Sequence, residues 1–157
     1  RVAEARERIK GPVAHKDWVW AKETLLLDAL IAKKHDVEVE VQAIQVGPVV
    51  CLSNPAEYFV SYGLQLKKRS GFPMTFPVEL ANGCVGYVPD EEAFGPNGGG
   101  YETRLTSYSN LDITAGTQFM NVGLELAAKM KPAKLPERPN GPAGKPWAYG
   151  DQPPQLK

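Results

Sequence analysis

Residues 49–106 decide the fold, and two short pieces within them, 54–59 (NPAEYF) and 82–94 (NGCVGYVPDEEAF), carry the chemistry. Each piece follows an apolar run of strand-like composition, VVCLS at 49–53 and MTFPVELA at 74–81. Ligands in open α/β sheets bind at the carboxyl ends of the strands, so both loops belong at one edge of the sheet. If the two strands lie side by side, Glu57 and Tyr87 converge at that edge.

The hydrophobic pattern predicts an α/β fold with a mixed sheet and flanking helices. Alternation of apolar and polar residues predicts a strand at 37–46, which Gly47 and Pro48 turn into a hairpin with 49–53. The apolar run 74–81 is typical of a strand that is buried on both faces. Helices are expected at 17–34, 55–69 and 113–130.

The expected helix starts rest on capping residues. Asp17 and Asp112 suit the N-caps of the first and last helices, and Asn54 or Ser53 suits the cap of the middle one, with Pro55 in its first turn. This places Glu57 in the first helical turn, where the helix dipole favours a carboxylate for structural reasons alone.

Composition divides the chain into three parts: an N-terminal helical lead-in at 1–16, an α/β unit at 17–130 and a tail or linker at 131–157. Half of the 14 prolines lie in the last part, which therefore is expected to be extended, with Trp147 and Tyr149 as residues that can pin it to the body. The chain has 18 acidic and 18 basic residues, so its charge indicates no binding to nucleic acid. No apolar run is long enough to span a bilayer.

Residues 86–102 resemble a known family. They run Gly-Tyr-Val-Pro-Asp-Glu-Glu-Ala-Phe, then a glycine loop, then Tyr101-Glu102, after a strand that ends in Asn-Gly. This order, with the Pro-x-Glu turn at 55–57, resembles the C-terminal part of the catalytic domain of neutral/alkaline (non-lysosomal) ceramidases and their bacterial relatives. The resemblance covers residues 18–126. It implies a zinc-dependent amidohydrolase that acts on a lipid-like N-acyl amide, in a secreted or periplasmic protein.

The resemblance also implies roles for single residues. Glu57 and Tyr87 match zinc ligands, and Tyr101 matches a tyrosine of the catalytic pocket. Asn82 is expected to shape the floor of the site, or is a plain turn residue. From the residues alone, Tyr101, Glu102 and Arg104 can form a hydrogen-bonded set at the pocket wall, with Arg104 binding substrate, or else a surface ion pair with little effect on stability. The ceramidases proper have small residues where this chain continues with Thr103 and Arg104. The glycine loop at 95–100 is expected to cover the site.

The predicted zinc site is incomplete within this chain. Hydrolytic zinc sites generally have three protein ligands, histidine prominent among them, and the family's two histidine ligands lie upstream, where nothing in this chain matches them. His15 and His35 have no metal-binding spacing and are expected at the surface. We therefore expect the histidines on a preceding segment, of the same parent chain or of a separate chain.

Other interpretations stay open. The chain could be a non-catalytic α/β interaction module, with the proline-rich tail as a partner ligand and Glu57 as a helix-capping residue. It could also be a ceramidase-like scaffold with a different substrate, because Val88-Pro89-Asp90 and the glycine loop depart from the ceramidases proper. Cys51 and Cys84 do not have zinc-finger spacing, and we expect buried free thiols rather than a disulfide.

Overall fold

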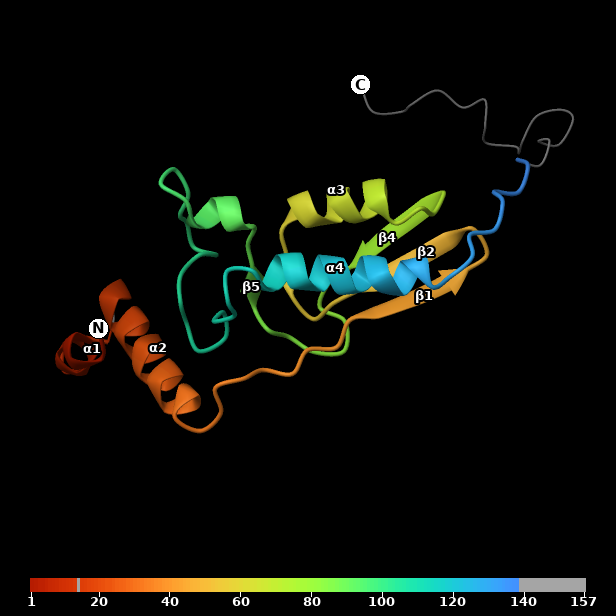
Figure 1. Ribbon diagram of the computed structural model, residues 1–157. Coiled ribbons are helices and arrows are strands. Elements are labelled where there is room, and N and C mark those ends of the chain that lie inside the picture. Colours follow the sequence, from red (N-terminus) through yellow and green to blue (C-terminus); the bar gives the residue numbers. More distant parts are fainter. Residues whose placement is uncertain (14, 139–157) are drawn as a thin grey trace, which may run out of the picture.

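A computed structural model describes residues 1–13 and 15–138 of the chain. Within these residues the chain forms four helices, a small mixed three-stranded sheet and a two-stranded parallel sheet, which confirms the predicted α/β fold class (Figure 1). The elements are α1 (Val2–Arg8), α2 (Lys16–Ile31), β1 (Gln42–Val46), β2 (Val49–Ser53), β3 (Glu57–Tyr58), α3 (Val60–Arg69), β4 (Met74–Val78), β5 (Tyr87–Val88), the 3₁₀ turn η1 (Glu91–Phe94) and α4 (Ala115–Ala128).

Strand β2 is the centre of the larger sheet, whose order is β1-β2-β4. The predicted hairpin is confirmed: β1 runs antiparallel to β2, with Val46 opposite Val49, and Gly47 makes the turn at a φ of 57°. Strand β4 runs parallel to β2, and α3 provides the crossover that a parallel pair needs. Two apolar side chains of β2, Val50 and Leu52, are 0% and 2% exposed.

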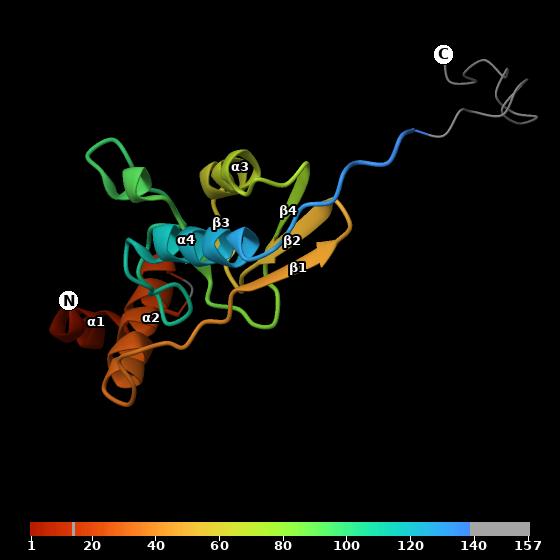
Figure 2. The same cartoon turned by 45° about the vertical axis from the view of Figure 1, so that its right-hand side comes forward.

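Helices α3 and α4 cover one face of this sheet (Figures 1 and 2). Gly63 of α3 approaches Pro77 of β4, and Gly123 of α4 approaches both Leu52 and Leu66, so both helices lie on the face that carries Leu52. The stacked rings of Tyr58 and Tyr62 lie beneath the start of α4, with their centroids 4.6 Å apart. The buried core consists of Val50, Leu52, Ala56, Tyr58, Tyr62, Leu66, Phe72, Val88, Ala115, Met120 and Ala127.

No helix or strand of the residues that the structure describes covers the opposite face of the sheet, and we call it the bare face. Its side chains form rows across the three strands because the register aligns them, and two of its residues, Ile44 and Val46, are more than half exposed. The prediction that 74–81 is buried on both faces is therefore wrong, since Thr75 is buried while its neighbours Met74 and Phe76 are 41% and 49% exposed. Helices cover only one side of β4.

Helices α1 and α2 pack on each other at the end of the molecule away from the sheet (Figure 1). Indole Nε1 of Trp18 donates to the carbonyl oxygen of Ile9 at 2.9 Å and joins the two helices. The N-cap of α2 is His15, whose Nδ1 accepts from the Asp17 amide, and not Asp17 as predicted. Asp17 instead lies in the first turn, where its charge suits the helix dipole.

The predicted helix at 55–69 begins only at Val60. Residues 54–59 stay extended because they continue β2 and pair with two other segments. The Val85 amide donates to the Pro55 carbonyl at 2.9 Å, and the Glu57 amide donates to Gly86 at the same distance. Asn54 accepts the Ala56 amide in a local turn rather than capping a helix. Glu57 thus lies on strand β3, so a favourable interaction with the dipole of a helix does not explain its carboxylate.

Other boundaries differ by a few residues. The predicted strand at 37–46 is paired only from Gln42, because its partner β2 ends opposite, at Ser53, and turns toward β3. The run 74–81 ends at Val78, and Leu80 has a φ of 51° that a strand cannot accommodate. Helix α4 begins after Thr114, its N-cap, while the Asp112 carboxylate accepts from the Thr114 amide and hydroxyl.

The tail begins after α4. Residues 131–138 are exposed and form no helix or strand, while Trp147 and Tyr149 lie outside the described residues. The two cysteines are free thiols: Cys51 is half-buried, and Cys84 is exposed rather than buried. In the described part of the chain, no helix combines the length and apolar character needed to cross a lipid bilayer.

The contact between α3 and α4 predicts the effect of a substitution at Gly116. A Cβ atom there would lie 2.5 Å from Cζ of Tyr62, whereas a Cβ at Gly123 would meet nothing closer than 3.7 Å. We expect Gly116→Ala to lower the free energy of unfolding by about 1–3 kcal/mol through overpacking. The control Gly123→Ala should raise it by about 0.5–1 kcal/mol, because alanine favours the helix. Urea unfolding followed by far-UV circular dichroism measures both, and equal effects would contradict the close packing.

Candidate functional site

Strands β3 and β5 bring Glu57 and Tyr87 together. These strands pair in parallel, and Glu57 is directly opposite Tyr87 in the register. Backbone hydrogen bonds on either side of the pair, from Glu57 to Gly86 at 2.9 Å and from Phe59 to Val88 at 3.3 Å, hold the alignment. Both side chains are half-buried. The convergence expected from the sequence is therefore present, at the ends of chain segments that leave β2 and β4.

The Glu57 carboxylate changes the chemistry of the Tyr87 phenol. The pKa of Tyr87 is raised above its ordinary value, first because the phenol acts as a hydrogen-bond donor to Glu57. Partial desolvation and the negative charges of Glu57 and Glu102 act in the same direction. Glu57 thus keeps the Tyr87 phenol protonated to a higher pH than an ordinary tyrosine.

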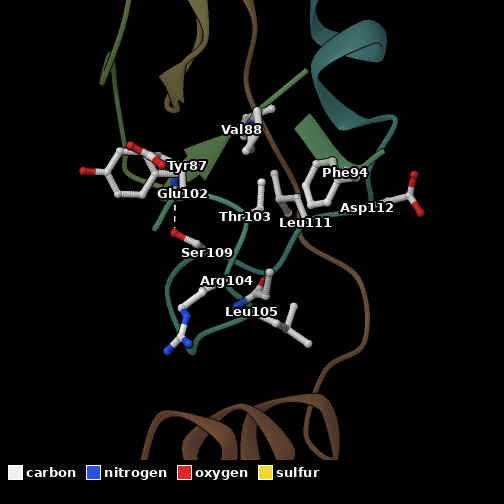
Figure 3. A pocket seen from close by; sticks show the side chains of 12 residues that line it. Tyr87, Val88, Phe94, Glu102, Thr103, Arg104, Leu105, Ser109, Leu111 and Asp112 are labelled. Atoms are coloured by element: carbon white, nitrogen blue, oxygen red, sulfur yellow. Dashed lines mark hydrogen bonds between the residues drawn. The ribbon is translucent and has the colours of Figure 1, made fainter. Parts of the chain in front are cut away.

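A tight turn at residues 106–109 packs against the backbone of Tyr87 and fixes its position. Its backbone amide donates to the Ser109 hydroxyl at 3.0 Å, as the dashed line in Figure 3 shows. The buried Thr106 hydroxyl accepts from the Ser109 amide at 2.9 Å and closes the turn. Gly86 permits this approach, because a Cβ atom there would collide with the Tyr108 carbonyl oxygen and the Ser109 hydroxyl. Its φ of 74° also favours glycine.

Tyr101 lies against Tyr87. The two rings meet edge to face, with centroids 5.5 Å apart and an interplanar angle of 83°. On its other side Tyr101 contacts Trp20 of α2, at 5.9 Å between centroids. Its hydroxyl is 3.2 Å from that of Tyr108, and this hydrogen bond is the largest cause of a raised pKa at Tyr108. Tyr101 is 52% exposed.

Arg104 lies on the side of the site that faces α2. Its guanidinium lies over the Trp20 ring, 4.4 Å from the centroid, which is a cation–π contact. Near it the Glu23 carboxylate accepts from the amide and hydroxyl of Ser107. Figure 3 shows Arg104 directed toward α2, with Glu102 beside Tyr87. Arg104 therefore connects α2 to the loop that carries Tyr101.

Glu57, Tyr87, Tyr101 and Arg104 form one cluster, and Asn82 is not part of it. Its side-chain amide donates to Glu40 at 3.3 Å, in the segment before β1, and the residue is exposed. The φ of 59° at Asn82 is a left-handed conformation that asparagine tolerates. Its backbone therefore shapes the loop between β4 and β5. No hairpin forms at Asn82-Gly83, because β4 and β5 belong to different sheets.

Two hollows border the cluster. A cavity of about 30 Å³ beside Tyr87, lined also by Glu102, Arg104 and Ser109, has room for about two water molecules (Figure 3). A groove of about 960 Å³ lies between α2, residues 33–39 and the start of α4, and Tyr108 reaches its wall. Its apolar lining is Leu27, Leu30, Ile31, Val37, Val39, Val85, Leu105, Leu111, Ala115 and Phe119.

The carboxylate and phenol oxygens of Glu57 and Tyr87 are of a donor type that zinc accepts, but they are only two. Among residues 1–13 and 15–138, no three His, Cys, Asp or Glu side chains gather closely enough to hold a metal ion. His15 and His35 are exposed, at 62% and 84% of their side chains, as expected.

Sequence reasoning missed several residues that support the site. Trp20, Glu23 and Ser109 reach it from distant parts of the chain, and no local pattern marks them. Gly86 had a signal, because a glycine just before a candidate ligand can mark a backbone that another segment approaches closely.

The Glu57–Tyr87 contact predicts a change of pKa. In Glu57→Gln the charge is removed, so the protonated phenol loses its main stabilisation and the pKa of Tyr87 should fall toward the ordinary tyrosine value. The signal of the labelled Tyr87 Cζ atom in a ¹³C NMR titration reports this pKa. The exposed Glu92, changed to Gln, is the control that should leave it unaltered. An unshifted Tyr87 in Glu57→Gln would show that the two groups do not interact.

The close approach of the 106–109 turn to Gly86 predicts that Gly86→Ala lowers the free energy of unfolding. Gly71, a glycine with a similar backbone conformation, gives the cost of backbone strain alone. Gly86 and Gly71 have almost the same φ, 74° and 76°, but a Cβ at Gly71 meets nothing within 4 Å. Gly71→Ala should cost about 1–2 kcal/mol for the left-handed conformation alone. Gly86→Ala should cost about 1–3 kcal/mol more, from the collision with the 108–109 backbone. Chemical unfolding measures both, and equal losses would refute the close approach.

Comparison of the chain with protein-family models, with curated proteins and with solved structures found no match. The geometry of the site is therefore argued from the residues of this chain alone. The resemblance to ceramidases stays a prediction.

Proposed function

We propose that this chain is the C-terminal part of a zinc-dependent amidohydrolase of neutral ceramidase type, which hydrolyses an N-acyl amide bond in a lipid-like substrate. In this proposal Glu57 and Tyr87 bind the zinc ion, and the remaining ligands are histidines of a preceding segment. The observation that carries the proposal is the register pairing of Glu57 with Tyr87, two oxygen donors brought side by side from distant parts of the chain.

Zinc in such a site polarises a carbonyl group and lowers the pKa of a water molecule to about 7. For Tyr87 to be a ligand, its phenol must lose the proton that the pair with Glu57 now holds. The positive charge of the metal favours that loss, so metal binding releases a proton. The affinity of the pair for zinc should therefore increase with pH.

Tyr101 is the proposed catalytic residue. Its exposed hydroxyl, next to Tyr87 and already hydrogen-bonded to Tyr108, can donate to the oxygen on which negative charge develops as the amide carbonyl is attacked. One such donor is typically worth about 3–4 kcal/mol in the transition state. Arg104 remains the predicted substrate contact at the wall of the site. The predicted role of Asn82 at the floor of the site rests on the resemblance alone, because its side chain donates to Glu40 outside the cluster.

The large groove supports the lipid-like substrate class. Its volume of about 960 Å³ lies within the usual range for ligand sites, and about half of its lining residues are aliphatic or aromatic, with charged side chains such as Lys33, Asp36 and Glu38 among the others. Tyr108 connects the wall of the groove to the Tyr101 hydroxyl. An alkyl chain in the groove would thus leave its polar end near Tyr101.

A second candidate function is a non-catalytic α/β interaction module. The bare face favours it, because Phe76, Ile44 and their neighbours present an apolar surface of the kind that binds a protein partner. In this case Glu57 and Tyr87 form only a structural contact. The ceramidase-like scaffold with a different substrate differs from the main proposal in substrate alone.

Metal analysis tests the proposal. In the natural gene product that includes this sequence, we expect about one zinc ion per molecule, lost in the Glu57→Gln, Tyr87→Phe double variant, because the carboxylate charge and the phenol oxygen are both removed. Tyr101→Phe should keep the zinc but slow hydrolysis of an N-acyl amide by about 100- to 1,000-fold. Tyr108→Phe is the control for zinc content: it changes a tyrosine outside the ligand set and should also keep the zinc. Zinc content that is the same in the double variant and the wild type would contradict the proposal and favour the interaction module.

A further inference from the structure

Helices α1 and α2 form a unit that is separate from the sheet and the helices that cover it. The two helices pack on each other, and the Trp18 indole joins them through its hydrogen bond to Ile9. In Figures 1 and 2 the pair lies at one end of the molecule, away from the sheet. We call residues 40–130, from which this pair is separate, the body. The pair is attached to the body by one covalent connection and by one group of side-chain contacts.

The covalent connection lacks hydrogen bonds. Residues 35–39 belong to no helix or strand, and 35–38 are exposed. None of the five forms a hydrogen bond, through backbone or side chain, with another residue that the structure describes. The first fixed point after α2 is Glu40, whose carboxylate accepts from Gln42 and Asn82. Exposed backbone without such bonds can change its φ and ψ angles with little loss of contacts, so residues 35–39 are suited to act as a hinge.

The side-chain contacts come from one face of α2. Trp20 and Glu23 are three residues apart and therefore point to the same side of the helix. The Glu23 carboxylate accepts from both the amide and the hydroxyl of Ser107. The Trp20 ring contacts the Tyr101 ring and lies under the Arg104 guanidinium. All three partners belong to one loop of the body, and we call this group of contacts the latch.

The groove of about 960 Å³ lies between the helix pair and the body. Leu30 and Ile31 line it although they are 47% and 46% exposed, so this wall is not sealed against the body. A change in the angle between α2 and the body changes the width of the groove, because its two walls belong to different units. The apolar lining of the first wall is Leu27, Leu30, Ile31, Val37 and Val39, and that of the second is Val85, Leu105, Leu111, Ala115 and Phe119.

We propose that the α1–α2 pair is a lid on this groove, which rotates about residues 35–39 and is held closed by the latch. The structure is the closed state. When the latch opens, α2 moves away from the body, and the wider groove admits an apolar ligand, the class that its aliphatic lining suits. The same movement separates Trp20 from Tyr101, so it changes the surroundings of the candidate site. The inference does not depend on a metal ion or on an activity.

Glu23 is the residue of the latch on which closure depends most. Hydrogen bonds to an ionised carboxylate are roughly twice as strong as those between neutral groups, and Glu23 accepts two of them. The loop that donates these bonds is itself fixed to the body, because the Ser109 hydroxyl accepts the Tyr87 amide and the turn packs against Gly86. Loss of the Glu23 carboxylate therefore releases α2 rather than the loop.

Double electron–electron resonance measures the position of the lid. The spin labels are attached at Asp28→Cys on α2 and Glu125→Cys on α4, two exposed positions, in the 157-residue chain with both native cysteines changed to serine. We expect Glu23→Ala to increase the population of long label-to-label distances at least threefold. Ser107→Ala removes one of the two donors and should cause a smaller change in the same direction. The control Lys22→Ala, next to Glu23 but outside the latch, should cause none.

A neutral apolar dye, N-phenyl-1-naphthylamine, tests access to the groove. Leu30→Lys on the groove wall should lower dye affinity at least tenfold, and Val46→Lys on the bare face should not, which locates the bound dye. In stopped-flow fluorescence we expect Glu23→Ala to raise the association rate constant at least threefold. Lys22→Ala should leave it unchanged.

Two results would overturn the inference. Unchanged distance distributions in Glu23→Ala, with a helical circular dichroism spectrum, would show that the carboxylate does not hold a moving lid. If Glu23→Ala fails to fold, Ser107→Ala decides the question by the same measurement. Dye binding that survives Leu30→Lys, or an association rate that Glu23→Ala leaves unchanged, would show that the lid does not control entry of an apolar ligand. Neither result bears on the zinc content by which the proposed function is tested.

Discussion

The extended path of residues 54–59 is the constraint on which the rest of the structure depends. Every amide N–H group in this stretch has an acceptor: the carbonyl oxygens of Val78, Gly86 and Val88, and the side chains of Asn54 and Glu79. Pro55 has no N–H to satisfy. Because these bonds connect the segment first to the end of β4 and then to β5, it fastens the core sheet to the candidate site. The position of Glu57 relative to Tyr87 follows from the same bonds.

The support of Tyr87 comes from the other direction. The turn at 106–109 packs its backbone directly against Gly86, and the Ser109 hydroxyl accepts the Tyr87 amide. Helix α2 in turn holds this loop through the contacts of Trp20 and Glu23. A side chain supported by a strand on one side and by a turn on the other has few alternative positions. This is the condition under which a two-residue strand can hold a functional group with any accuracy.

The sequence allowed prediction of the fold class, the hairpin and the convergence of the two loops, because these depend on local periodicity and on turn residues. It failed where distant pairing overrode a local signal. Asn54 and Pro55 are good helix-start residues, yet the backbone of Asn54 pairs with Val78 and Ala81. Residues 55–59 pair with 85–88, and the helix is delayed to Val60. The exposure of Met74 and Phe76 was unpredictable for a similar reason, since apolar composition indicates that a surface suits burial and not whether something covers it. Trp20 and Ser109 reach the site only through tertiary packing.

The contact between Glu57 and Tyr87 has opposite meanings with and without a cation. Alone, a carboxylate beside a phenol stabilises the proton, which is why the pKa of Tyr87 is raised. In the proposed function, a divalent ion held by Glu57 and Tyr87 would reverse this preference, because its charge would favour the phenolate over the protonated phenol. The alignment of the two residues is made by strand hydrogen bonds and by Gly86 rather than by the side chains themselves. The proposed exchange of a proton for a metal ion would therefore require no rearrangement of the backbone, and its outcome would depend on further ligands at this edge of the sheet.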